Sequence, residues 1–199
     1  FLDDSKIKYL LDKLSDNILM VIDGAYAEYI ENFDAGLSLV NNHNNLIILR
    51  TFSKIYGLAA LRVGWSYSSS WIAKIINQVR GPFNISSPAI AAAVAAVLDV
   101  DYTRDCLVEN LKNREWLSRK LKDLRLNITD SKANFVLVDF NSEKQANKAF
   151  SFLKNQNIYV RKVTDYGLNK SLRITVGTND ECKLVKKNIQ KFLEFDNGV

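Results

Sequence analysis

The sequence predicts an α/β fold over residues 1–100 and a compact α+β domain over residues 101–199. Two observations support this division. In the first part, amphipathic helical patterns and short apolar runs follow one another, which is typical of helices and strands in an α/β sheet. In the second part, the patterns follow the order strand, helix, two strands, helix, which is typical of a compact α+β layer.

In the first part, residues 5–14 carry apolar side chains spaced as i, i+3, i+4 and i+7, which predicts an amphipathic helix. The next run, residues 17–22, predicts a buried strand that ends in Asp23. The remaining elements are expected as strands at 46–49 and 61–67, a helix at 71–79, a break at 81–84, and a helix capped by Ser86 or Ser87 with Pro88 in its first turn.

In the second part, periodic apolar positions predict a long helix over residues 104–124. The elements after it are expected as a strand at 134–140, a helix at 143–156, strands at 158–163 and 172–176, and a final helix. Thr178-Asn179-Asp180-Glu181 has the spacing of a capping box, which predicts where the final helix begins.

The composition is that of an ordinary globular chain, with 47% hydrophobic residues, 25% charged residues and a net charge of +5. Positive and negative side chains are interspersed, for example over residues 112–123, which favours a solvated helix surface over a nucleic-acid footprint. The longest apolar run, residues 89–98, is too short to span a bilayer. Cys106 and Cys182 have no metal-site spacing, so we expect two free thiols in a reducing cytoplasm and no bound metal. His43, the single histidine, is given no role.

Lys54 follows the apolar run at 46–49 and stands in the stretch Thr51-Phe52-Ser53-Lys54. Burial among apolar neighbours favours the neutral amine, which is nucleophilic toward a carbonyl. Ser53 offers a hydroxyl and Arg62 a cationic fork, a pair that suits an anionic phosphate, and Thr51 is a weaker candidate for the same role. An amine beside a phosphate clamp indicates pyridoxal phosphate held as a Schiff base. The alternative is a solvated lysine and an arginine in a surface ion pair.

A second group of candidate residues is Asp23-Gly24-Ala25-Tyr26. In open α/β sheets, ligands bind at the carboxyl ends of strands, where Asp23 is expected. A carboxylate there can keep a pyridinium nitrogen protonated, and Tyr26 is close enough in sequence to donate to the ring's phenolate oxygen. The residues alone favour the alternative, a turn of the Asx type at a strand end.

Arg173 and Arg161 are placed in predicted strands of the second part. An unpaired arginine is costly to bury, so each needs a carboxylate partner or an anionic ligand. For Arg173 the residues alone favour a structural ion pair, because arginines are rarely buried unless paired.

The motif Ser53-Lys54 followed by Tyr56-Gly57-Leu58 and Leu61-Arg62-Val63-Gly64 resembles the lysine motif of fold-type I pyridoxal-phosphate aminotransferases. The whole chain resembles the C-terminal part of the histidinol-phosphate aminotransferase family. The family's Asp-x-Ala-Tyr motif matches Asp23 to Tyr26, except that the family usually has Glu where this chain has Gly24. Gly24 is expected to loosen the turn. The resemblance implies that residues 1–100 are the C-terminal portion of a large cofactor-binding domain with a mainly parallel sheet, and that residues 101–199 are the small domain.

The resemblance implies an enzyme that moves an amino group between a phosphorylated amine or amino acid, similar to histidinol phosphate, and a 2-oxo acid such as 2-oxoglutarate. Lys54 would be the catalytic base, Arg173 would bind the substrate's anionic group, and Arg161 would be a weaker second contact. A cytoplasmic homodimer is implied as well. The alternatives are a pyridoxal-phosphate-dependent decarboxylase of a phosphorylated amino acid and a non-enzymatic module that binds nucleic acid.

The first chemical motif arrives only at Asp23, and the resembled family has further sheet strands and phosphate-binding residues before that point. Three strands before residue 101 would leave the edges and faces of a parallel sheet uncovered. We therefore expect that the 199 residues are not the whole functional unit.

Overall fold

A computed structural model describes residues 2–197 of the chain. The chain divides into two compact units, residues 1–107 and residues 108–199. The division falls within helix α4 (Val100–Asp123), a few residues after the boundary expected at residue 100. That the two parts are a cofactor-binding large domain and a small domain stays a prediction.

The first unit contains helices and strands in the alternation that the sequence predicts. They are α1 (Asp4–Lys13), β1 (Met20–Asp23), β2 (Leu46–Thr51), β3 (Gly64–Ser68), α2 (Ser70–Val79), α3 (Ser87–Leu98) and the first turns of α4, with 3₁₀ turns at Ala27–Tyr29, Leu37–Asn42 and Ala59–Leu61. Ser86 caps α3 as expected, because its hydroxyl accepts a hydrogen bond from Ala89 N at 3.3 Å.

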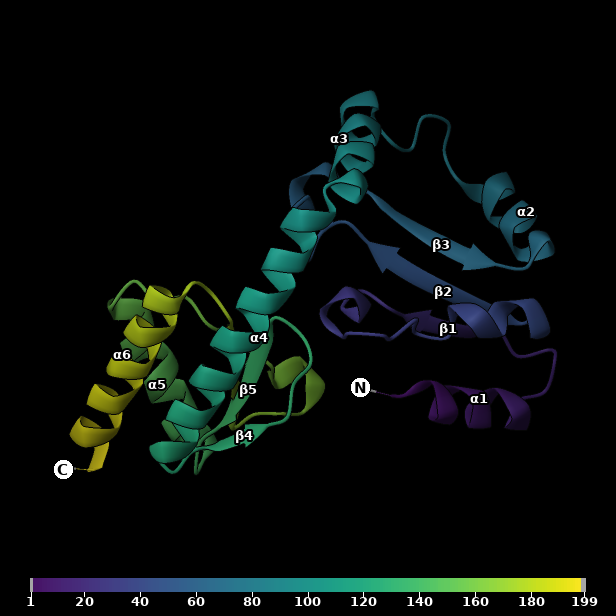
Figure 1. The fold of residues 1–199 in the computed structure, drawn as a ribbon. Coiled ribbons are helices and arrows are strands. Elements are labelled where there is room, and N and C mark those ends of the chain that lie inside the picture. Colours follow the sequence, from purple (N-terminus) through teal and green to yellow (C-terminus); the bar gives the residue numbers. More distant parts are fainter. Residues whose placement is uncertain (1, 198–199) are drawn as a thin grey trace. The chain divides into compact units, whose positions relative to one another are not determined.

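The sheet of the first unit has the strand order β1-β2-β3 (Figure 1). β1 and β2 are parallel, with Asp23 opposite Leu49, whereas β2 and β3 are antiparallel, with Thr51 opposite Gly64. The antiparallel pair arises because the chain reverses direction over residues 52–63, and the two ends of this connection are joined where Phe52 N donates to Val63 O at 3.2 Å. The α/β class is confirmed, and the sheet is mixed rather than mainly parallel.

Two small apolar clusters hold the first unit together. In one, Ile7 and Leu11 of α1 pack with Leu46 and Ile48 of β2, and in the other Phe52 and Val63 pack with Ala89 and Ala93 of α3. β1 is less buried than the sequence predicts, since alternate residues of the strand are exposed. Apolar side chains on the uncovered side include Val21, which is 53% exposed, and Leu49.

The second unit contains a four-stranded antiparallel sheet in the order β4-β5-β7-β6. Its elements are the rest of α4, β4 (Asn127–Thr129), β5 (Phe135–Asp139), α5 (Glu143–Asn155), β6 (Arg161–Lys162), a 3₁₀ turn at Thr164–Tyr166, β7 (Ser171–Thr175) and α6 (Asn179–Asn197). The sequence reading missed β4, because three residues are too short to show an alternating pattern. It also predicted β6 too long, at 158–163, because Ile158 instead closes α5, donating to Leu153 O at 2.9 Å.

One continuous core fills the second unit. Leu172 and Ile174 of β7 and Val136 and Val138 of β5 point into it, together with apolar residues of α4, α5 and α6. Because side chains alternate along a strand, Arg173 lies on the opposite face of the sheet from this core. The capping box at the start of α6 is confirmed: Thr178 N donates to Glu181 Oε2 at 2.7 Å, and Glu181 N donates to Thr178 Oγ1 at 3.4 Å.

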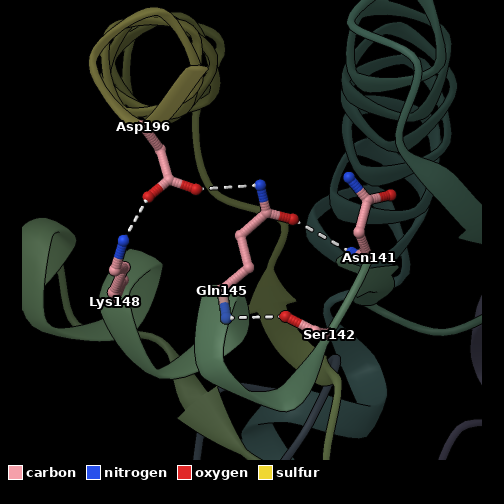
Figure 2. Close-up of polar contacts among 5 residues, drawn as sticks. All are labelled: Asn141, Ser142, Gln145, Lys148 and Asp196. Carbon is pink, nitrogen blue, oxygen red and sulfur yellow. Dashed lines mark hydrogen bonds and ion pairs between the residues drawn. The ribbon is translucent and has the colours of Figure 1, made fainter. Parts of the chain in front are cut away.

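A polar network joins the first turn of α5 to the end of α6 (Figure 2). Lys148 Nζ lies 2.7 Å from Asp196 Oδ1, and Gln145 Nε2 donates to Asp196 Oδ2 at 3.1 Å. Asn141 N donates to Gln145 Oε1 at 3.0 Å, and Ser142 Oγ accepts from Gln145 N at 3.2 Å. The hydrogen bonds from Lys148 and Gln145 lower the pKa of the Asp196 carboxyl.

Over residues 2–197, no helix combines the length and the apolar character that crossing a membrane requires. The same residues contain no group of three or more His, Cys, Asp and Glu side chains that could hold a metal ion. Cys106 is half-buried and Cys182 is buried, and both thiols are free.

Candidate functional site

The candidate residues form two groups, one in each unit. Those of the first unit are Asp23, Tyr26, Thr51, Ser53, Lys54 and Arg62, and those of the second unit are Arg161 and Arg173.

Asp23 and Lys54 follow neighbouring parallel strands. Asp23 is the last residue of β1, and Lys54 comes shortly after β2 ends at Thr51. The carboxyl ends of parallel neighbours meet at one edge of a sheet, so the two residues belong to the same edge. Asp23 is exposed, and its Oδ1 accepts a hydrogen bond from Ala25 N at 3.0 Å. This is the Asx-type turn considered as the alternative, and a carboxylate that makes it still has acceptor sites for a ligand.

Lys54 lies against the ring of Tyr26. Its Nζ is 5.3 Å from the ring centroid, within the range of a cation–π contact. Lys54 is half-buried, whereas its chain neighbours Phe52 and Ile55 are buried. The lysine therefore lies beside an aromatic ring and is only partly exposed to solvent.

The three candidates for binding phosphate, Thr51, Ser53 and Arg62, are not all brought into contact with one another. Thr51 Oγ1 accepts from Ser53 N at 3.1 Å, so these two residues form one turn after β2. Arg62 is exposed and has a left-handed backbone with φ of 55°, and its Nη1 donates to Ala59 O at 2.9 Å. A non-glycine residue with positive φ is uncommon and often marks a constrained site. Among the described residues, no hydrogen bond joins Arg62 to Ser53 or Thr51.

Tyrosine rings gather near this edge of the sheet. Tyr29 is buried, and burial raises its pKa to about 12. Burial also raises the pKa of Tyr56, whose ring centroid lies 4.9 Å from that of Phe52. Both phenols therefore stay protonated at neutral pH.

The sequence reading missed a buried ion pair beside the site. Arg50 Nη1 lies 3.0 Å from Glu28 Oε1, and the two side chains are only 6% and 16% exposed. The sequence does contain a signal for it, because Arg50 directly follows the apolar run at 46–49. A buried arginine needs a partner, so the sequence predicts a partner for Arg50 as it does for Arg173.

In the second unit, Arg161 and Arg173 stand directly opposite each other on β6 and β7. Directly opposed residues of an antiparallel pair have side chains on the same face. The guanidinium carbon of Arg173 lies 5.0 Å from the centroid of the Phe135 ring, and Arg173 Nε is buried without a hydrogen-bond partner among the described residues. The structural ion pair that the residues alone favoured for Arg173 is not seen among those residues.

The side chains at the edge of the first sheet fit pyridoxal phosphate by their chemistry. Asp23 has a carboxylate of the kind that binds a ring nitrogen, Tyr26 has a phenol, and Lys54 has an amine of the kind that reacts with an aldehyde. Ser53 and Arg62 supply a hydroxyl and a guanidinium of the kind that bind phosphate.

Comparison with known proteins agrees with this chemistry. The chain matches the family Aminotransferase class I and II over residues 2–189. A histidinol-phosphate aminotransferase of Dinoroseobacter shibae is 47% identical over 183 residues, which cover 92% of this chain and 51% of that protein. One of Ruegeria sp. (strain TM1040) is 42% identical over 191 residues, which cover 96% of this chain and 53% of that protein.

A similar solved structure is the crystal structure of histidinol-phosphate aminotransferase from Sinorhizobium meliloti in complex with pyridoxal-5'-phosphate. It has a TM-score of 0.89 and 28% sequence identity, and the match covers 98% of this chain and 54% of that chain. This chain thus spans about half the length of the curated relatives it matches. The resemblance to fold-type I enzymes is confirmed, and the chain belongs to the class I and II aminotransferase family.

Proposed function

We propose that the protein is a pyridoxal-phosphate-dependent aminotransferase. Its reaction would move an amino group between a phosphorylated amine or amino acid of the histidinol-phosphate type and a 2-oxo acid such as 2-oxoglutarate. The observation that carries the proposal is the contact between Lys54 and Tyr26, at the same sheet edge as Asp23. The names of the relatives at 42% and 47% identity support the choice of substrate class.

Each side chain of the first group has a role in this proposal. Lys54 would hold the cofactor through its aldehyde and would move the proton at the substrate's α-carbon. Asp23 binds the ring nitrogen, Tyr26 donates to the ring oxygen, and Thr51, Ser53 and Arg62 bind the phosphate. The cofactor, when bound, supplies an aldehyde that takes up the amino group and a ring that stabilises negative charge beside it.

Arg173 and Arg161 are proposed to bind the substrate's phosphate or carboxylate. Like charges directly opposite each other in a sheet are destabilising, so two opposed arginines favour an anion between them. The buried, unpartnered Nε of Arg173 supports the same reading. The guanidinium fork matches the geometry of either anion.

Borohydride reduction tests the role of Lys54, because it makes a lysine–cofactor bond permanent. Peptide mapping of the intact protein should find the cofactor on Lys54. Lys74, an exposed lysine of α2, is the internal control and should stay unlabelled. A label on any other lysine would overturn the assignment.

Decarboxylation is the alternative reaction on the same cofactor residues. The structure of L-threonine-O-3-phosphate decarboxylase from Porphyromonas gingivalis is similar, with a TM-score of 0.84, but at 20% identity this likeness bears on the fold alone. Assaying amino transfer to 2-oxoglutarate beside carbon dioxide release would separate the two reactions.

A homodimer in the cytoplasm is also part of the proposal. Ile90, Val94 and Val97 of α3 are each more than half exposed, which leaves apolar surface for a partner to cover. Sedimentation of the intact protein would show whether it is a dimer.

A further inference from the structure

Arg50 holds the segment that follows β1 at three points. Its Nη1 lies 3.0 Å from Glu28 Oε1, and its Nη2 donates to Asp34 O at 2.9 Å. Its aliphatic stem lies over Gly24, because a Cβ built on Gly24 would stand 3.0 Å from Arg50 Cδ and Nε. One side chain of β2 therefore contacts residues 24, 28 and 34, all of which come after β1.

Gly24 is a tight position rather than a loose one. Gly24 N donates to Leu49 O at 2.9 Å, and a Cβ on Gly24 would stand 2.9 Å from that same oxygen. The expectation that Gly24 loosens the turn is therefore wrong for this chain. The stem of Arg50 fills the place that a side chain at residue 24 would need.

In sequence, Tyr26 lies halfway between Gly24 and Glu28, two of the residues that Arg50 contacts. Glu28 belongs to the 3₁₀ turn Ala27–Tyr29, which is closed by Ala27 N donating to Gly24 O at 3.0 Å and Tyr29 N donating to Tyr26 O at 3.1 Å. With residues 24 and 28 both held by Arg50, the backbone of Tyr26 has little freedom. The ring of Tyr26 in turn lies 5.3 Å from Lys54 Nζ.

We propose that Arg50 is a positioning residue that, through Gly24 and Glu28, fixes the Tyr26 ring against Lys54. Arg50 is the last residue but one of β2, and Lys54 follows three residues after the strand ends, so Arg50 ties the segment after β1 to the strand that leads into Lys54. Buried ion pairs contribute little net stability relative to apolar packing, and in some proteins they specify one arrangement. Positional precision matters here, because a displacement of about 1 Å in an active site can cost on the order of a hundredfold in rate.

The inference rests on the proposed cofactor function, so the experiment has one arm that needs cofactor and one that does not. The variants are Arg50→Met, Glu28→Ala and Glu28→Gln, made in the intact protein. Glu28→Gln keeps an acceptor for Arg50 and loses only the charge, whereas Glu28→Ala loses the contact. The control is Asp196→Ala, which removes an ion pair and a hydrogen bond far from these residues in sequence (Figure 2).

Without cofactor, amide hydrogen exchange is read at Ala27 and Tyr29. We expect exchange at least about tenfold faster in Arg50→Met and Glu28→Ala, and near wild type in Glu28→Gln and Asp196→Ala. Unchanged exchange in Glu28→Ala would overturn the positioning role, whether or not the protein binds cofactor. Because Arg50→Met is the variant at risk of not folding, the two Glu28 variants carry the test by themselves.

With pyridoxal phosphate, the pH midpoint of the bound cofactor's absorption band is read. We expect it to move by about half a pH unit or more in Glu28→Ala and Arg50→Met, and to stay near wild type in Glu28→Gln. Equal shifts in Glu28→Gln and Glu28→Ala would mean that charge, not position, is responsible, and would overturn the inference. If wild type shows no cofactor band, the proposed function fails while the exchange arm still decides the role of Arg50.

Discussion

Arg50 and Arg173 have similar sequence settings and opposite surroundings. Both are arginines in strands, next to apolar residues. Arg50 is buried and is bound inside its unit by Glu28 and by the carbonyl of Asp34, although its Nε, like that of Arg173, is buried without a hydrogen-bond partner among the described residues. Arg173 is half-buried, lies beside the Phe135 ring, and faces Arg161 across the strand pair.

The difference shows what the cost of burying charge can and cannot decide. That cost predicts that each arginine has a partner, but it does not decide whether the partner is a side chain or a ligand. Whether the partner is a side chain or a ligand depends on which residues the strand faces. Arg50 points toward the long connection after β1, which brings Glu28, whereas the face of β7 that carries Arg173 has a second arginine directly opposite.

The largest expected effect is a difference in the free energy of unfolding between variants of Arg50 and variants of Arg173. Arg50→Met leaves the Glu28 carboxylate buried without its partner and should lower the free energy of unfolding by about 3–5 kcal/mol. Arg173→Met strands no carboxylate and should change it by no more than about 0.5 kcal/mol. Urea unfolding of the intact protein measures both. The double variant Arg50→Met/Glu28→Leu should recover part of the loss, and an equal loss in Arg173→Met would break the comparison.

The second effect concerns ligand binding. Arg173→Lys replaces a planar fork by a point charge and should weaken binding of a phosphorylated amine substrate about tenfold, or ~1.4 kcal/mol. Pyridoxal phosphate retention, read from its absorption band, should not change. Arg161→Lys serves as the matched variant on the facing strand, with a smaller expected loss because Arg161 is exposed. Unchanged substrate affinity in Arg173→Lys would mean that Arg173 has a structural role and does not bind the substrate.

The third effect tests the packing of Arg50 on Gly24. Gly24→Ala places a methyl group against Leu49 O and the stem of Arg50, and should lower the free energy of unfolding by about 1–2 kcal/mol. Gly81→Ala is the control, since a Cβ there would meet no atom within 4 Å. Thermal unfolding of both variants gives the comparison. Equal stability of the two variants would show that the contact over Gly24 is easily relieved.

The sequence was sufficient wherever one local pattern fixes an element. The spacing of Ile7 and Leu11 predicted α1, and Thr178 with Glu181 predicted the start of α6. The apolar runs before Asp23 and Lys54 placed both residues at strand ends, and Asp23 is the last residue of β1 whereas Lys54 follows β2. These features depend on residues that are close together in the chain.

The features that the sequence did not give depend on residues distant in the chain. The Arg50–Glu28 pair joins residues 22 positions apart, and the tight packing at Gly24 depends on Arg50. The antiparallel pairing of β3 depends on how the chain turns between Phe52 and Val63, which no periodicity encodes. The assignments of Arg62, Arg161 and Arg173 stay predictions, because each concerns a ligand.

The smallest expected effect is at an exposed charge contact, the capping box of α6. Hydrogen bonds from the Thr178 backbone and hydroxyl lower the pKa of Glu181 from its ordinary value of 4.5. A lowered pKa in the folded state means that the stabilisation is present above the unfolded pKa and is lost as pH falls through the folded pKa. Glu181→Gln should therefore cost a few tenths of a kcal/mol at pH 7, an amount kept small by solvent.

The same difference between wild type and Glu181→Gln should vanish in acid, where the wild-type carboxyl is protonated and resembles the amide. Urea midpoints measured at pH 7 and at a pH below the folded pKa check this sign. Thr178→Ser keeps the hydroxyl and should retain the pH dependence, whereas Thr178→Ala should weaken it. A difference that grows in acid would mean that the Glu181 carboxylate does not stabilise the start of α6.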